Sequence, residues 1–376
     1  MYGISRFTLS AVLLIFTLIS NVSAREIEMT GYASLIGSYT DEEDTTYLNE
    51  FAQNYIDFTH HSHIGLQLNT KIIKDLEFSI TLLSEGKNQY QTRAAWFYAT
   101  YTIDRDISFR FGRLKLPFYL VSNFIDIGHA YPWVTPPEEV YTTNIIDASQ
   151  GIEFIYETDY YNSVLTFNTY LGSDRSSKKL SPSFIDDGTV NIANKYSTGD
   201  SFDIEAHELF GFAVNLSSDY VTFQVTHNQT VIESKELNIK KTRVSLGSFG
   251  LIFDYKNFIL YSELTHRDSE APLQSILPDQ NSKYITLGYK LSKYMPYITY
   301  ATIGKGKTDS KYALVQQTST IGLRYDVNPK MAIKVQASKI KPDYSDGNTG
   351  RYGLFDKALA ADKEPTLVSM SVDILF

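Results

Sequence analysis

The 376-residue sequence contains no cysteine, 11 prolines and only 2 tryptophans. Without cysteine the chain can form neither a disulfide scaffold nor a cysteine-ligated zinc site. Positive charge is also scarce: 34 Lys and Arg stand against 43 Asp and Glu, and the formal net charge of -9 argues against a nucleic-acid-binding protein. The composition argues against a disordered chain too, because 43% of the residues are hydrophobic and 14% are aromatic.

Long hydrophobic runs are absent except near the N-terminus. An apolar run over 11–19 follows Arg6, and small residues at 21–24 come next, which is the pattern of a secretory signal peptide. We therefore predict a signal peptide over 1–24 and one domain over 25–376. A buried N-terminal helix is the alternative interpretation of the same run. Beyond residue 24, no apolar stretch approaches the ~20 residues that a membrane helix needs.

Aromatic residues are plentiful, with 28 Tyr and 22 Phe, although the mean hydropathy is -0.20. Apolar and polar residues alternate through much of the chain, as they do over 78–82, 221–225, 285–289 and 333–337. Successive side chains of a β-strand point to opposite faces, so this period of two predicts strands. The clearest case is the C-terminal segment, whose apolar face consists of Val368, Met370, Val372, Ile374 and Phe376.

Short polar turns and longer polar stretches separate these predicted strands. The turns lie at 74–75, 104–106, 158–161, 217–219, 256–257, 292–293 and 328–329, and they join fourteen strands in pairs. A first strand near 26–39 and a last one at 366–376 bring the predicted number to sixteen. The longer stretches include 40–52, 117–147, 173–206, 268–281, 305–316 and 342–365.

This organisation predicts an all-β transmembrane antiparallel barrel with short periplasmic turns and long outer loops. Strands of about ten residues suit a tilted membrane crossing, and an even number of strands lets the sheet close without an unpaired edge. A wide barrel has a polar interior and an apolar exterior, which explains a near-neutral mean hydropathy. A soluble β-sandwich or propeller is the alternative.

Two segments resemble Gram-negative outer-membrane porins. The terminal Phe376, with apolar residues at alternate positions back to Val368, resembles the signal that the barrel assembly machinery reads. The segment FRFGRLKLP at 109–117, followed by AYPWVTPPEEVY at 130–141, is similar to a stretch of the general porin superfamily, where a basic strand end enters a loop that folds into the barrel. The resemblance implies a sixteen-stranded homotrimer in outer-membrane lipid that passes small polar solutes and ions passively, without enzymatic activity.

The long segment 117–147 lies between the fifth and sixth predicted strands, where the resemblance places a constriction loop. A surface loop packed on a neighbouring subunit is the alternative. We predict a charged constriction in which Arg110, Arg113 and Lys115 face Asp126, Glu138 and Glu139. Alternation places Arg110 in the lumen, whereas Arg113 and Lys115 reach it only with a bulge at Gly112. The other charges predicted to face the lumen are Glu153, Glu157, Arg243, Lys290, Arg324 and Lys334.

Other classes of function find weaker support. An outer-membrane lipid or peptide hydrolase has no Gly-x-Ser-x-Gly motif here to support it. A ligand-binding or adhesive barrel would use the loops at 173–206 and 342–365. His60, His61 and His63 lack a carboxylate at metal-ligand spacing, and the glycine-rich segment 304–308 lacks the first glycine of a phosphate-binding loop. We therefore predict no metal, no cofactor and no nucleic-acid partner. Lumen charges of both signs leave ion preference open.

Overall fold

The computed structural model describes residues 27–48, 51–144, 146, 148–179, 201–275, 277–307, 313–343, 353–355, 359 and 363–376. The predicted signal peptide over 1–24 lies outside these residues. Within them, no helix is long and apolar enough to cross a membrane.

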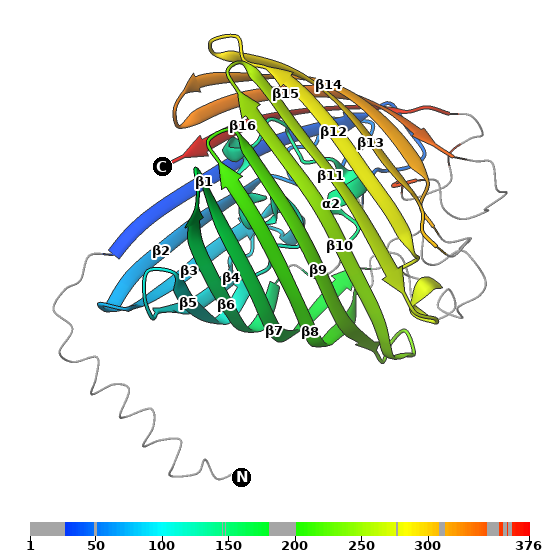
Figure 1. The fold of residues 1–376 in the computed structure, drawn as a ribbon. Helices are drawn as coiled ribbons and strands as arrows, with labels where there is room; N and C mark the ends of the chain where they lie inside the picture. Colours follow the sequence, from blue (N-terminus) through cyan, green and yellow to red (C-terminus); the bar gives the residue numbers. More distant parts are fainter. Residues whose placement is uncertain are drawn as a thin grey trace.

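Sixteen antiparallel strands form one closed barrel, as predicted (Figure 1). Each strand pairs with its neighbours in sequence, and β1 pairs with β16 to close the sheet. The strands are β1 Ile27–Thr40, β2 His63–Ile73, β3 Leu76–Glu85, β4 Arg93–Thr102, β5 Ile107–Lys115, β6 Ala148–Tyr160, β7 Ser163–Lys179, β8 Ser201–Ser218, β9 Val221–Ser234, β10 Ile239–Tyr255, β11 Phe258–Ser269, β12 Gln280–Tyr289, β13 Tyr294–Lys305, β14 Gln316–Asn328, β15 Met331–Pro342 and β16 Thr366–Leu375.

Each of the seven predicted turns lies where two paired strands meet, although β6 continues to Tyr160 and so includes most of the turn predicted at 158–161. The prediction of a loop over 173–206 is wrong at both of its ends. β7 continues to Lys179 and β8 begins at Ser201, with pairs running from Asp174 and Ala206 outward. The β7 end, 173–179, is polar throughout, so no apolar alternation marks it as strand. At the β8 end Phe202, Ile204 and Ala206 alternate with polar residues, a signal that the prediction missed. The prediction therefore underestimated the lengths of β7 and β8.

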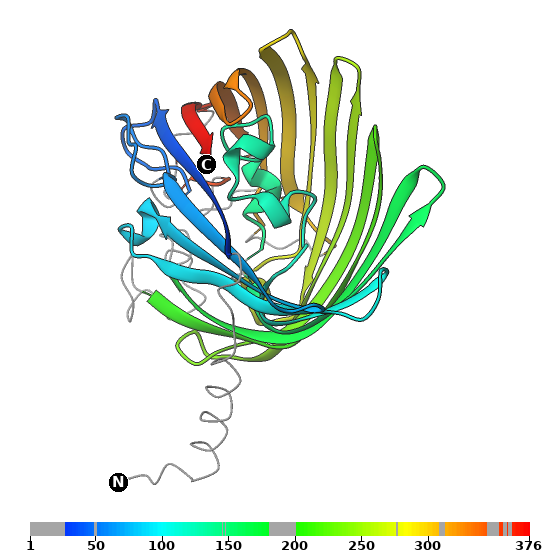
Figure 2. The ribbon, with the colours of Figure 1, turned by 90° about the vertical axis from the view of Figure 1, so that its left-hand side faces the viewer.

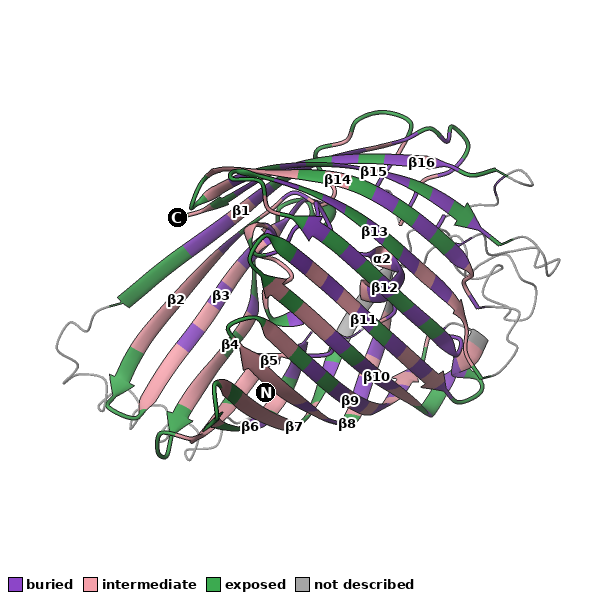
Figure 3. Cartoon of the chain, turned by 45° about the horizontal axis from the view of Figure 1, so that its top comes forward, coloured by how far each residue is buried: buried purple, intermediate pink, exposed green. Residues whose placement is uncertain are grey.

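The two faces of the strands differ as a membrane barrel requires. In β12 the side chains of Tyr284 and Thr286 point inward and are buried, whereas Ile285 and Leu287 are 42% and 46% exposed on the outside. The same alternation runs along the neighbouring strands (Figure 3). The apolar residues of β16 also point outward, and Phe376 at its end is 54% exposed. An apolar band therefore surrounds the barrel.

The segment 117–147, hereafter the inner loop, lies inside the ring of strands (Figure 2). It contains two short 3-10 helices, η2 Ser122–Phe124 and η3 Gly128–Ala130, and the single-turn helix α2 Glu138–Tyr141. α2 packs against β11, β12 and β13. The inner loop buries its aromatic and aliphatic side chains against the inward face of the wall, including Phe118, Tyr119, Leu120, Trp133 and Val140.

Candidate functional site

One side of the inner loop is fixed to the wall by rings and neutral hydrogen bonds. The indole nitrogen of Trp133 donates to the hydroxyl of Thr286 at 2.9 Å, and its ring meets that of Tyr284 edge-on at 5.6 Å. Gly250 in β10 leaves room for Leu120, because a Cβ there would lie 2.8 Å from the Leu120 side chain. This side of the loop is therefore a continuous apolar contact with β10–β14.

Two buried carboxylates join the loop to the same wall. Glu263 of β11 accepts hydrogen bonds from the backbone of Leu120 at 3.0 Å and from the hydroxyl of Tyr141 at 2.8 Å. Glu139 of the loop accepts from the amide of Gln316 at 2.7 Å and from the hydroxyl of Thr318. Burial raises the pKa of Glu139 above its ordinary value, since the charged form loses its hydration.

Two basic residues of the wall hold the backbone of the loop. Lys334 is 1% exposed, donates to the carbonyl of Gly128 at 2.5 Å and to that of Trp133 at 2.7 Å, and forms an ion pair with Asp373 at 2.9 Å. Arg324 donates to the carbonyl of His129 at 2.8 Å. Both lie inward as predicted, but their charges face carbonyl groups of the loop.

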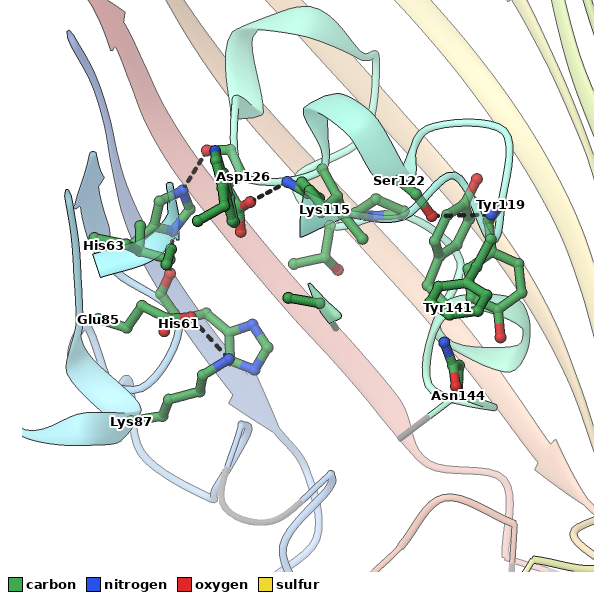
Figure 4. A pocket seen from close by; sticks show the side chains of 18 of the residues that line it. His61, His63, Glu85, Lys87, Lys115, Tyr119, Ser122, Asp126, Tyr141 and Asn144 are labelled. Carbon is green, nitrogen blue, oxygen red and sulfur yellow. Dashed lines mark hydrogen bonds and ion pairs between the residues drawn. The ribbon is translucent and has the colours of Figure 1, made fainter. Parts of the chain in front are cut away.

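The opposite side of the inner loop borders a charged cavity of about 280 Å³ next to β2–β5 (Figure 4). Glu85 at the end of β3 forms ion pairs with Lys87 at 2.8 Å and with Arg93 at 2.7 Å. Across the cavity, Lys115 forms an ion pair with Asp126 of the loop. Burial opposes ionisation of Asp126, but the ammonium group of Lys115 outweighs it and lowers the pKa of this carboxyl below its ordinary value.

Glu138 also lines this cavity, and it differs from the other acidic groups there. It is half-buried and forms no ion pair with a described residue. Burial raises the pKa of Glu138 to about 8, although a hydrogen bond from Thr135 favours the charged form. The cavity thus contains a carboxyl group that takes up a proton more readily than an ordinary glutamate does.

His63 links β2 to the inner loop. One of its ring nitrogens lies 2.9 Å from the carbonyl oxygen of His61, and the other lies 2.7 Å from that of Asp126. Burial, followed by the nearby His60, lowers the pKa of His61 well below its ordinary value. No group of His, Asp or Glu side chains in the described part of the chain is arranged to hold a metal ion.

The predicted opposition between the basic wall and the acidic loop needs correction. Arg110 forms an ion pair at 3.4 Å with Glu153 of the neighbouring strand, and Arg113 forms one at 2.8 Å with Asp174 of β7. Of the predicted partners, only Lys115 and Asp126 meet across the lumen. Glu139 points away from the basic residues and accepts hydrogen bonds from Gln316 and Thr318 of β14.

The predicted bulge at Gly112 is not a register shift. The ladders of β5 remain continuous on both sides, and Gly112 has a φ of 141°. The register shift lies instead in the ladder between β3 and β4. It falls between Thr81 and Leu82 of β3 and makes Ala95 the extra residue of β4. The carbonyl of Ala95 accepts a hydrogen bond from Arg113 at 3.0 Å, so the displaced backbone helps to hold this side chain inward.

The inward orientation predicted for Arg243 is wrong. Arg243 shares the outer face of β10 with Phe249, whereas Thr242 is buried and Val244 packs on the inner apolar cluster. The inner loop makes the lumen apolar at this height, so an apolar neighbour does not mark the lipid side. By contrast, Lys290 lies on the inward side with Asp254 at 2.6 Å. Glu157 follows the inward alternation of β6 and accepts a hydrogen bond from Thr166 at 3.3 Å.

No family model and no curated protein matches the sequence. Solved structures do: an anion-selective porin from Comamonas acidovorans is 12% identical, with 93% of this chain and 99% of that chain covered and a TM-score of 0.60. OmpF of Salmonella typhi, in complex with daunomycin, is 12% identical, with 94% of this chain and 98% of that chain covered and a TM-score of 0.59. A loop L8 deletion mutant of OmpT, an outer membrane protein of Vibrio cholerae, is 12% identical, with 94% of this chain and 100% of that chain covered and a TM-score of 0.58. The chain has a Gram-negative porin-type fold.

In this porin-type barrel, several residues of the site were missed by the sequence prediction. Asp174 lies in a segment that was predicted to be loop, and Gln316 lies at a predicted strand boundary. Glu263 carried a usable signal, since it alternates with the outward Leu260 and Leu264 and must therefore point inward. Glu85 ends a strand whose alternation also places it inside.

Proposed function

We propose that the protein is an outer-membrane porin, a passive diffusion channel for small hydrophilic solutes and ions. The observation that carries this proposal is the uneven attachment of the inner loop. The loop packs mainly on the inward face of β9–β16 and leaves a charged cavity along β2–β5 within a closed barrel. A water-filled path of this kind narrows the lumen without sealing it, and its charges select among solutes.

The ion pairs around the cavity suit passage rather than tight binding. Arg93, Arg113 and Lys115 each have a carboxylate partner within the protein. A passing solute with a carboxylate or ammonium group exchanges one hydrogen-bonded partner for another, so it gains little net binding energy. Passive permeation requires such weak binding, since a solute must also leave.

Export, assembly and oligomeric state form part of the same proposal. The signal peptide over 1–24 directs the chain out of the cytoplasm, and the apolar face of β16 that ends at Phe376 is read by the barrel assembly machinery. We place the barrel in the outer membrane as a homotrimer. In support, a similar solved structure of OmpT from Vibrio cholerae is a trimer form.

Planar-bilayer recording of the purified protein tests the proposal. We expect stepwise conductance that falls in the Ala95→Trp variant, because Ala95 is buried beside the cavity. Ala99→Trp on the outer face of the same strand is the matched control and should conduct like the wild type, since Ala99 pairs with the outward Phe111. A silent wild-type barrel, or equal conductance of the two variants, would contradict the proposal.

The proposed activity makes and breaks no covalent bond. Incubation of the purified protein with phospholipid or peptide should therefore release no product. Hydrolysis of either substrate, absent from a heat-unfolded sample, would favour an enzyme instead.

A further inference from the structure

The outer wall contains two adjoining hollows toward the long-loop end of β10–β15. The first has a volume of about 860 Å³ and the second a volume of about 550 Å³. Tyr300 on β13 lines both hollows, so they adjoin at this residue, and we refer to the two together as the groove. Outward residues of these strands line both hollows.

Small residues at outward positions create this groove. A Cβ added to Gly304 would meet nothing within 4 Å, and one added to Gly247 would meet only a backbone oxygen at 3.8 Å. In the second hollow the outward positions between larger side chains are Ser319 and Ala337. The floor of the groove is therefore largely backbone, which a ligand can approach closely.

The groove is apolar toward the middle of the wall and cationic toward the loops. Ile298 and Ile321 are 57% and 66% exposed in the second hollow. Lys283 lines the first hollow and Lys339 lines the second, each on the loop side of the apolar residues. No described carboxylate lines either hollow. Between the two levels, the hydroxyl of Tyr300 donates to the side chain of Gln317 at 3.1 Å.

Register fixes the spacing of the two lysines. Lys283 pairs with Thr302 of β13, and Lys339 pairs with Ser319 of β14. They stand three strands apart, which corresponds to about 14 Å across the sheet, and they are offset by two residues, about 7 Å, along the strands. An ammonium group is a strong donor to phosphate oxygens, and a surface lysine attracts anionic lipid headgroups.

The acidic groups near the groove already interact with other basic residues. Asp268 interacts with His266 at 3.2 Å and forms an ion pair with Lys307, while the carboxylate of Glu364 pairs with Lys341 at 3.3 Å. Lys339 donates one proton to the backbone carbonyl of Glu364. An ammonium group carries three protons, so two remain for a ligand.

We propose that this groove binds a phosphate-bearing lipid of the surrounding membrane. The acyl chains lie in the second hollow against Ile298 and Ile321, and the phosphate lies at the level of Lys283 and Lys339. The proposal rests on the membrane location of the barrel and not on its conductance. A lipid held there would stabilise the wall to which the inner loop is attached.

Native mass spectrometry of the full barrel released from nanodiscs tests this proposal. The discs contain phosphatidylcholine and phosphatidylglycerol in equal amounts, and we expect the wild type to retain phosphatidylglycerol preferentially. Lys283→Gln together with Lys339→Gln should lower the ratio of retained phosphatidylglycerol to phosphatidylcholine roughly tenfold. The matched control, Lys293→Gln with Lys330→Gln in the short turns of the same strands, should leave the ratio unchanged.

A second variant tests the apolar part. Ala337→Leu fills the second hollow and should reduce the number of retained lipids of both kinds. The proposal would be overturned if the lysine variant and its control retained the two lipids in equal ratios. It would also be overturned if inorganic phosphate alone displaced the lipid, or if a second copy of the chain covered the groove in the released oligomer. Conductance is recorded separately, so a silent channel and a failed lipid site are distinguishable.

Discussion

The two sides of the inner loop meet different surroundings within one barrel. Toward β10–β15 the loop buries Trp133 and Val140 and places its carbonyl groups on Lys334 and Arg324. Toward β2–β5 it presents charged groups to a cavity, where Asp126 meets Lys115. One side resembles a protein core, and the other resembles a hydrated surface.

This difference shows how a loop can narrow the lumen of a barrel and still leave a charged cavity beside it. Burying an unpaired charge is costly, so the attached side uses apolar contacts and carboxylates that accept several hydrogen bonds. The open side instead pairs its charged groups with one another, as Lys115 pairs with Asp126 and Arg93 with Glu85. Apolar contacts and charged groups therefore occupy opposite faces of the same segment.

Removing the charge of Lys334 should have the largest effect on the attached side. Lys334→Met leaves Asp373 as a buried charge without its cation, which costs about 3–5 kcal/mol of unfolding free energy. Thermal unfolding followed by heat-modifiable gel mobility measures this loss. The double variant Lys334→Met with Asp373→Leu should recover part of it, and no recovery would contradict the assignment of the cost to the unpaired carboxylate.

Truncating Trp133 should come next. Trp133→Ala removes a fully buried ring and its hydrogen bond, at a cost of about 3 kcal/mol. The loosened loop should also make single-channel current noisier than in the wild type. Tyr160→Ala, at an exposed position near a short turn, serves as the control and should change neither stability nor noise.

On the open side, charge changes should alter ion selectivity. Arg110→Gln together with Arg113→Gln leaves Glu153 and Asp174 without their cations, so the lumen becomes more negative. We expect the reversal potential in a salt gradient to shift toward cation preference. Arg105→Gln in an exposed turn is the matched control. An unchanged reversal potential would refute the lumen assignment of the two arginines.

The smallest effect should come from pH. Because the pKa of Glu138 is raised to about 8, its carboxyl is neutral below that value and charged above it. Cation preference should therefore rise between about pH 7 and 9, and Glu138→Gln should abolish this rise. The unfolded chain binds fewer protons between the ordinary pKa and 8, so the contribution of Glu138 to stability falls as pH rises through this window. A flat wild-type profile would contradict this prediction.

The sequence predicted the barrel better than it predicted the contacts within it. Period-two alternation and polar turns depend on neighbouring residues, and they located all sixteen strands. The partners of Arg110 and Arg113 depend on register between strands, which no local pattern reveals. Arg243 was misplaced for a related reason: the inner loop makes part of the lumen apolar, and alternation alone cannot distinguish that surface from lipid.

The position of Asp373 links the closure of the barrel to the shape of its lumen. Its carboxylate accepts a hydrogen bond from Ser34 at 2.6 Å across the β1–β16 seam, 339 positions away in the sequence, and it pairs with Lys334. Gly128 of the inner loop lies against the same carboxylate, where a Cβ would come within 2.2 Å of it. One buried carboxylate therefore joins the seam of the barrel to the inner loop, so a change at the seam also disturbs the segment that narrows the lumen.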